Sequence, residues 1–202
     1  QRCHTCWMRK ELCLCSELHL IRTRTRVEFL IRKRELKSPS NTGRLAAQCL
    51  ANSGIHVHGD RDVEHGWTQQ FAGSPSAFVL YPDTIAIPLD ATFIARYSYP
   101  VTLIVPDGNW RQTQKMIRRV PELADLPRVR LADDAPTRYR VRHDTRAGGL
   151  ATIEAVARAL GVLEGAPVRA TLEDAFEAAM QRILVSRGIL QRETINGGMG
   201  QK

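Results

Sequence analysis

Short runs of apolar residues recur along the chain and predict the strands of a sheet. The runs cover residues 26–31, 77–81, 101–105 and 128–131. The second and third runs are almost wholly apolar, which is typical of strands in a parallel sheet with helices on each side. The pattern therefore predicts an α/β domain with a mostly parallel sheet and helices on both faces. The length of 202 residues is ample for one buried core.

Between and after these runs, the apolar residues recur with helical spacing. Helices are predicted from Leu45 onward and over residues 110–119, 155–160 and 172–183. Ser40, Asn41 and Thr42 are all residue types that cap a helix, and one of them is expected to cap the first helix. Asn109 is expected to cap the second, with Gln112 as its capping partner. Thr152 is a candidate cap for the third helix, and Gly161 is expected to end it.

Four of the five cysteines lie in the first 15 residues, spaced as Cys3-x2-Cys6-x6-Cys13-x-Cys15. Four thiolates this close together suit one tetrahedral Zn²⁺ ion, and a closed four-thiolate site is structural. Two disulfides are the alternative, which a basic chain without an export signal disfavours. We therefore expect a zinc-binding segment over residues 1–22, an α/β domain over 23–190 and a tail over 191–202.

The charge of the chain points to a polyanionic partner. Lys and Arg number 29 against 21 Asp and Glu, which gives a net charge of +8 and favours nucleic acid. The candidate backbone-binding residues in these basic stretches are Arg22, Arg24, Arg111, Lys115, Arg140 and Arg142. Solvated strand faces are the alternative explanation. No apolar run of 18 residues and no secretory signal occur, so we expect a cytoplasmic protein without a membrane partner or an obligate protein partner, and favour a monomer.

One turn follows the apolar run 101–105 directly and opens the helix at 110. It places Asp107, Gly108, Asn109 and Trp110 at the carboxyl end of a predicted strand, where open α/β sheets bind their ligands. An ordinary turn with a helix cap is the alternative explanation. The loop at 40–44 also leads into a helix, and such a helix start with Arg44 nearby is a candidate anion site.

Together these pieces resemble the DTW-domain family of tRNA-uridine aminocarboxypropyltransferases. The resemblance spans nearly the whole chain in the order of the family. It rests on the cysteine cluster, Ser40–Leu45, Leu80-Tyr81-Pro82, Asp107–Trp110 with Lys115-Met116, Tyr139–Arg142 and Ala151–Ala155. Asn109 stands where the naming motif of the family usually has threonine, which leaves any role specific to that hydroxyl open.

The resemblance implies a SPOUT-like fold whose C-terminal part is knotted and binds S-adenosylmethionine. The implied reaction moves the 3-amino-3-carboxypropyl group of S-adenosylmethionine to N3 of a uridine in tRNA and releases 5'-methylthioadenosine. Two rival functions are a SPOUT-like S-adenosylmethionine-dependent RNA methyltransferase and a zinc-dependent RNA-binding module without catalysis.

The resemblance also suggests roles for individual residues. Asp107, Asn109 and Trp110 are the candidate catalytic residues, with Asp107 either the base for N3 or a ligand of the donor's positive groups. The residues expected around the donor are Leu80, Tyr81, Pro82, Asp107, Gly108, Trp110, Leu150, Thr152 and Glu154. Those expected near the transferred group or the target nucleotide are Ser40, Asn41, Thr42 and Arg44.

Overall fold

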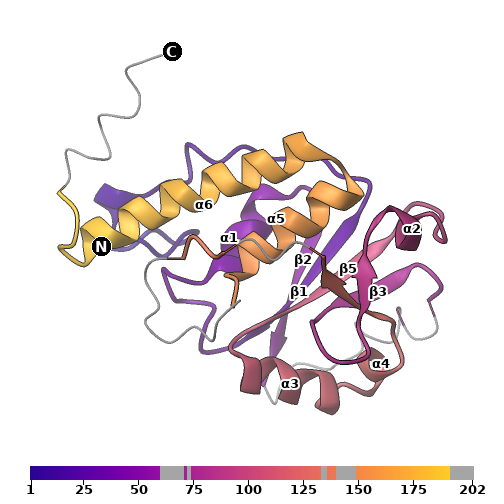
Figure 1. The fold of residues 1–202 in the computed structure, drawn as a ribbon. Helices are drawn as coiled ribbons and strands as arrows, with labels where there is room; N and C mark the ends of the chain where they lie inside the picture. The colour runs from indigo at the N-terminus through magenta and orange to yellow at the C-terminus, as the bar shows by residue number, and fades with distance from the viewer. Residues whose placement is uncertain (60–70, 72–73, 133–135, 140–148, 192–202) are drawn as a thin grey trace.

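The computed structural model describes residues 1–59, 71, 74–132, 136–139 and 149–191 of the chain (Figure 1). Six strands form one sheet in the order β2-β1-β5-β3-β6-β4, and each strand pairing is parallel. The strands are β1 (Arg26–Arg32), β2 (Ser53–His58), β3 (Ala77–Leu80), β4 (Ile87–Leu89), β5 (Thr102–Asp107) and β6 (Arg128–Leu131). Their carboxyl ends therefore lie along one edge of the sheet.

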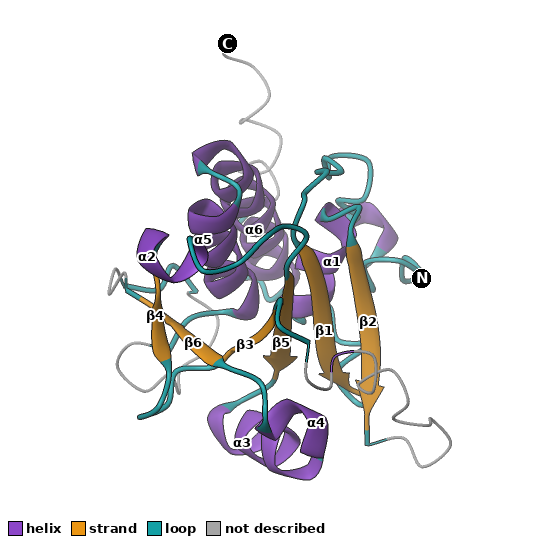
Figure 2. Ribbon diagram, turned by 90° about the vertical axis from the view of Figure 1, so that its right-hand side faces the viewer, coloured by secondary structure: helices purple, strands orange, loops and turns teal. Residues whose placement is uncertain are grey.

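Helices cover both faces of the sheet, as the sequence predicts. Helices α1, α5 and α6 gather on one side, and α3 with α4 lies on the other (Figure 2). The helical elements are η1 (Lys10–Leu12), α1 (Thr42–Cys49), α2 (Ala91–Ile94), α3 (Trp110–Arg119), α4 (Pro121–Ala124), α5 (Thr152–Leu163) and α6 (Ala166–Ser186). Among the described helices, none is long and apolar enough to cross a membrane.

The central strand β5 shows why the apolar runs become strands here. Leu103 and Val105 pack into the core beneath α1, α5 and α6, whereas Ile104 packs into the second core beneath α3 and α4. Side chains alternate between the faces of a strand, so a strand covered on both sides needs apolar residues at successive positions. The β5 backbone then delivers Asp107 to the carboxyl edge of the sheet.

Two details of the predicted helices are wrong. Gly161 does not end α5, which continues to Leu163; a Cβ at Gly161 would lie 3.0 Å from the side chain of Arg169 in α6, so the glycine allows the two helices to approach. Thr152 is the first residue of α5, and Ala151 occupies the cap position. Helix α6 is longer than its apolar stripe at 172–183.

The first 22 residues pack against the α/β domain. Cys6, Met8 and Leu14 are buried and belong to the same core cluster as α1, α5 and α6. Leu14 has no exposed surface at all. The segment therefore shares its apolar core with the rest of the chain. Of the predicted tail, residues 192–202 lie outside the described part of the chain.

Candidate active site and metal centre

Asp107, at the carboxyl end of β5, is the centre of a buried hydrogen-bonded junction. Its side chain is 5% exposed. Oδ2 accepts a hydrogen bond of 2.5 Å from Nδ2 of Asn41, and Oδ1 accepts one from the hydroxyl of Thr152. Asn41 is predicted to lie near the target nucleotide and Thr152 near the donor; the structure brings both onto the Asp107 carboxylate.

Local structure explains why these two side chains point at Asp107. Asn41 caps α1 by accepting a hydrogen bond of 2.7 Å from the backbone N–H of Arg44, which leaves its amide nitrogen to donate to the carboxylate. Thr152 begins α5, and its backbone N–H donates to the hydroxyl of Thr42 over 3.1 Å. Asp107 thus lies between the starts of two helices, whose dipoles favour negative charge there.

The helix that follows the turn is capped as predicted. Asn109 accepts a hydrogen bond from the backbone N–H of Gln112, and the Gln112 side chain accepts one from the backbone N–H of Asn109, each over 3.0 Å. Trp110, the first residue of α3, keeps 38% of its surface exposed. Its ring centroid lies 6.0 Å from that of Tyr81, which follows β3. The turn therefore supplies a helix cap and a partly exposed tryptophan, which meets the half-buried Tyr81 at the carboxyl edge.

Glu154 is the second buried carboxylate near this edge. It accepts hydrogen bonds from the backbone N–H of Ala151 over 2.8 Å and of Arg138 over 2.6 Å. The hydroxyl of Thr137 donates a third, also over 2.6 Å. These contacts hold the described segment 136–139 against the start of α5. They make Glu154 a positioning residue for this loop. Of the other residues predicted around the donor, Leu80 is buried at the end of β3, Leu150 is half-buried and Pro82 is exposed.

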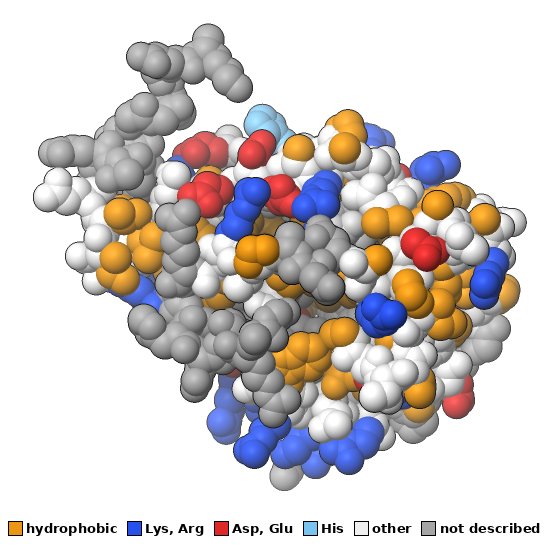
Figure 3. Space-filling view, in the orientation of Figure 1, with side chains coloured by type: hydrophobic (Ala, Val, Ile, Leu, Met, Phe, Trp, Pro, Cys, Tyr) orange, Lys and Arg blue, Asp and Glu red, His pale blue; other side chains and the backbone are white. Residues whose placement is uncertain are grey.

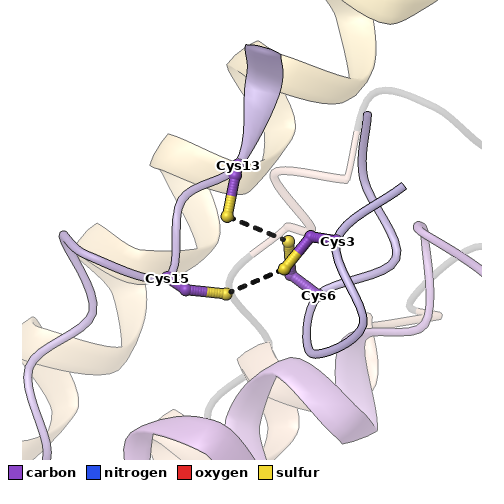
Figure 4. A group of neighbouring side chains, drawn as sticks. All are labelled: Cys3, Cys6, Cys13 and Cys15. Carbon is purple, nitrogen blue, oxygen red and sulfur yellow. Dashed lines mark hydrogen bonds between the residues drawn. The ribbon is translucent and has the colours of Figure 1, made fainter. Parts of the chain in front are cut away.

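The four N-terminal cysteines point toward one another from two stretches of the segment (Figure 4). Their sulfurs all lie within 4.8 Å of one another. The Cys3 and Cys15 sulfurs are 3.8 Å apart and those of Cys6 and Cys13 are 3.7 Å apart. A disulfide needs about 2.05 Å, so all four are free thiols. With Zn–S bonds of about 2.3 Å, tetrahedral ligands stand about 3.8 Å apart. The donor set therefore fits a tetrahedral metal ion.

The protonation of these thiols differs because their surroundings differ. Backbone hydrogen bonds from Cys6 and then Thr5 lower the pKa of Cys3 to about 6, so its thiolate predominates at neutral pH. Burial raises the pKa of both Cys13 and Cys15. Thiols bind metal as thiolates, so a metal ion that binds here at neutral pH must displace protons.

Comparison with known proteins covers this whole arrangement, from the cysteine cluster to α6. Residues 1–184 match the family model described as the DTW domain. The chain belongs to the DTW domain family. The resemblance identified from the motifs is thereby confirmed at the level of the family.

Three curated relatives of this DTW domain carry the name tRNA-uridine aminocarboxypropyltransferase 2. The protein from Drosophila melanogaster is 31% identical over 126 residues, which are 62% of this chain and 49% of the relative. Those from Macaca fascicularis and Mus musculus are 26% and 28% identical over 170 and 171 residues, each 80% of this chain and 56% of the relative. The chain thus spans about half the length of the curated relatives it matches.

The predicted RNA-binding residues of this DTW domain fall into different environments. Arg22, Arg111 and Lys115 are exposed, and Ser40 is half-buried. Arg24 is exposed, with its guanidinium 4.0 Å from the ring centroid of Tyr99. Arg140 and Arg142 lie outside the described residues. Arg22, Arg111 and Lys115 are therefore accessible to a polyanion, whereas Arg24 also pairs with Glu164 at 3.8 Å.

Arg44 differs from the other cations, because it is buried. Its guanidinium donates to the backbone carbonyls of Thr5, of Cys6 over 2.9 Å and of Ser38 over 3.0 Å. The structure thus gives Arg44 a structural role, tying the cysteine segment to α1, in place of the phosphate or carboxylate contact predicted for it. Residues far away in the sequence decide whether a cation at a helix start faces solvent or carbonyl groups. The local sequence around Arg44 therefore could not predict its contacts.

Gly43, in the loop predicted as a candidate anion site, lies against the Asp107 carboxylate in this DTW domain. A Cβ at Gly43 would stand 2.8 Å from Cγ of Asp107 and 3.1 Å from each carboxylate oxygen. The carboxylate can reach Asn41 and Thr152 only because residue 43 lacks a side chain. The glycine within a run of cap-forming residues was the sequence signal for this close approach.

Gly43→Ala is therefore expected to destabilise the chain by about 1–3 kcal/mol, as overpacking does. Denaturant unfolding measures this effect. In an Asp107→Ala background the clash is absent, so the same substitution should cost less than about 0.5 kcal/mol. Strict additivity of the two substitutions would contradict the contact.

Proposed function

We propose that this DTW domain transfers the 3-amino-3-carboxypropyl group of S-adenosylmethionine to N3 of a uridine in tRNA. A new N3–C bond forms, the bond from that carbon to sulfur breaks, the N3 proton is released and 5'-methylthioadenosine leaves. Membership of the family and the printed name of its relatives support the activity. The observation that carries it is the Asp107 carboxylate, buried between two helix starts at the carboxyl edge of a parallel sheet.

The surroundings of Asp107 favour binding the donor over acting as base. Both carboxylate oxygens already accept a hydrogen bond, from Asn41 and Thr152, and the starts of α1 and α5 stabilise its negative form. Both effects weaken a base. A carboxylate favours a positive charge beside it, so the Asp107 side chain suits the ammonium group or the sulfonium of the donor. We therefore assign Asp107 to holding the donor.

The aromatic pair formed by Tyr81 and Trp110 suits a nucleobase. The two side chains come from the ends of neighbouring strands β3 and β5, and Trp110 is partly open to solvent. Stacking on an aromatic side chain contributes about 1–3 kcal/mol per base. We propose that Trp110 stacks on the adenine of the donor or on the target uracil.

Trp110→Ala should lower kcat/KM about tenfold through loss of this stacking, and Trp110→Phe should retain most of the activity. Steady-state rates are measured once with the donor concentration varied and once with the tRNA concentration varied. A higher KM for the donor indicates stacking on adenine, and a higher KM for tRNA indicates stacking on the target uracil. Val162→Ala shortens an exposed apolar side chain in α5 and serves as the control. Equal activity of Trp110→Ala and the unmodified chain would refute the stacking role.

We further propose zinc as the metal at the cysteine cluster and tRNA as the partner of the basic surface. A site with four cysteine ligands is closed to substrate, so zinc would hold the segment in place. Lys and Arg side chains gather along the lower edge of the molecule, over α3 (Figure 3). The exposed cations of that helix are Arg111, Lys115, Arg118 and Arg119. Such a row suits phosphates of the RNA backbone.

The SPOUT-like knot stays a prediction, because residues 140–148, which lead toward α5, lie outside the described part of the chain. A cytoplasmic location and a monomeric state also stay predictions from the sequence.

The deciding experiment supplies purified protein with unmodified tRNA and S-adenosylmethionine labelled in either the methyl or the carboxyl carbon. Carboxyl label in the tRNA, with release of methylthioadenosine, is the expected result. Mass fragmentation of the modified nucleoside then locates the group on N3. Methyl label would establish a methyltransferase instead. Absence of both labels, with tRNA still bound, would favour a non-catalytic RNA-binding module.

A further inference from the structure

A small cleft lies where the N-terminal segment meets the end of α6. Its volume is about 130 Å³, and its lining includes Arg2, Arg9, Arg182 and Ser186 together with apolar side chains. Residues of the N-terminal segment and of the last turns of α6 line this cleft together. Among the described residues that line the cleft, three are arginines and none is acidic. The cleft is therefore lined by positive charge.

Arg2 and Arg9 stand directly opposite each other in an antiparallel bridge. Residues paired in this way have Cβ atoms about 5 Å apart with both side chains on the same face, and like charges there are destabilising. Nη1 of Arg2 donates to the carbonyl of Trp7 over 2.9 Å. Arg9 lies 4.0 Å from the exposed carboxylate of Glu11, a weak surface pair. An anion bound between the two guanidinium groups would relieve their repulsion.

Arg182 adds a third guanidinium from α6. It is 5% exposed, donates to the carboxylate of Glu17 and donates from Nη1 to the carbonyl of Ala178 over 3.0 Å. These two contacts fix the side chain in the wall of the cleft. They use two of the five N–H groups that a guanidinium can donate. The carboxylates of Glu11 and Glu17 do not balance the three arginines.

We propose that this cleft, the Arg2–Arg9–Arg182 cleft, binds a backbone phosphate of the tRNA substrate. The inference rests on the proposed function, in which tRNA is the substrate. The planar fork of arginine matches phosphate oxygens. A volume of about four water molecules, at about 30 Å³ each, admits one phosphate group. The cysteine segment then binds RNA through its own arginines, and the metal fixes the position of the segment that carries them.

A competing explanation is that Arg2 and Arg9 neutralise the metal centre, because four thiolates with one divalent ion carry a net negative charge. The test therefore follows metal content together with RNA binding. The zinc-loaded full chain is compared with Arg9→Ala, with Arg2→Ala/Arg9→Ala and with Lys10→Ala. Lys10 is an exposed neighbour outside the cleft, so its loss removes the same charge as Arg9→Ala.

Binding of an unmodified tRNA transcript is measured without S-adenosylmethionine at several salt concentrations. The double variant should bind about tenfold more weakly and reduce the slope of log K against log salt by about 1. Arg9→Ala should show a smaller change of the same sign. Lys10→Ala should change affinity less than about twofold, and all variants should keep one metal ion per chain.

Three results would overturn the cleft proposal. In the first, the double variant loses its metal and the salt slope of tRNA binding does not change. In the second, Arg9→Ala and Lys10→Ala weaken tRNA binding equally. In the third, the variants bind tRNA as tightly as the unmodified chain, while calorimetry shows that inorganic phosphate binds in a way that depends on Arg9. Failure of the transferase proposal looks different. There, the unmodified chain binds tRNA through the cleft arginines yet incorporates no carboxyl label.

Discussion

Asp107→Asn is expected to lower kcat/KM for transfer about 100-fold, or about 2.7 kcal/mol, while the chain stays folded. Asparagine keeps the shape of the junction, because its carbonyl can accept from Asn41 and its amide can donate to the hydroxyl oxygen of Thr152. What it removes is the negative charge between the starts of α1 and α5. A hydrogen bond to a charged group is worth about 1.5–3 kcal/mol, which matches the expected loss.

The same variant separates the two roles weighed for the Asp107 carboxylate. If it holds the donor, calorimetry will show weaker binding of S-adenosylmethionine by Asp107→Asn. If it is the base, donor affinity will be unchanged and the loss will lie in kcat. Asp125→Asn makes the same chemical change at an exposed residue after α4 and should be neutral. Full activity of Asp107→Asn would exclude the carboxylate from the reaction.

Removing the metal is expected to lower the free energy of unfolding by several kcal/mol, because binding to a site formed only in the folded chain adds directly to folding. The effect should reach the whole domain, since Cys6, Met8 and Leu14 share the main core. Urea unfolding of the chelated protein and of Cys3→Ser/Cys6→Ser, with metal content measured in parallel, tests this. Cys49→Ala, a buried cysteine outside the cluster, should retain the metal and cost about 1 kcal/mol.

Loss of the metal should also weaken donor binding, through Arg44. Its guanidinium holds the carbonyls of Thr5 and Cys6, and its backbone N–H donates to the Asn41 side chain that contacts Asp107. A disordered cysteine segment would therefore loosen the first turn of α1. Unchanged affinity of the metal-free chain for S-adenosylmethionine would show that residues 1–22 form an independent unit.

Local sequence patterns were sufficient to predict the helices and strands whose ends are set by local interactions. The helix predicted over 110–119 matches α3 at both ends, since the capping box marks its start. Strand β2 was missed: its sequence mixes glycine and two histidines with two apolar residues, and it lies at the edge of the sheet. Strand β4 is only three residues long. Short or edge strands take their conformation from a neighbour, and the sequence pattern carries little sign of it.

The candidate site likewise combines a part that local sequence predicts with contacts that it does not predict. The predicted strand, turn and capped helix identified Asp107 from sequence, but its partners Asn41 and Thr152 are 66 and 45 residues away along the chain. Local sequence could not predict these two contacts.

Glu28 is a further residue with a partner from another part of the chain. It is buried in β1, and although burial raises its pKa, hydrogen bonds from His56 and Arg26 lower the pKa more. A single carboxylate within an apolar run indicates a buried acid that needs hydrogen-bond partners, and this pattern could have identified Glu28.

The junction at Asp107 also bears on how the chain acquires its native state. The three segments that meet there are far apart in sequence, and contacts between such distant segments slow folding relative to local contacts. Two of them exist once β5 has been synthesised, but Thr152 follows 45 residues later. A growing chain therefore cannot complete the junction until α5 has docked, so nascent or truncated chains that end before residue 152 should not bind the proposed donor, S-adenosylmethionine.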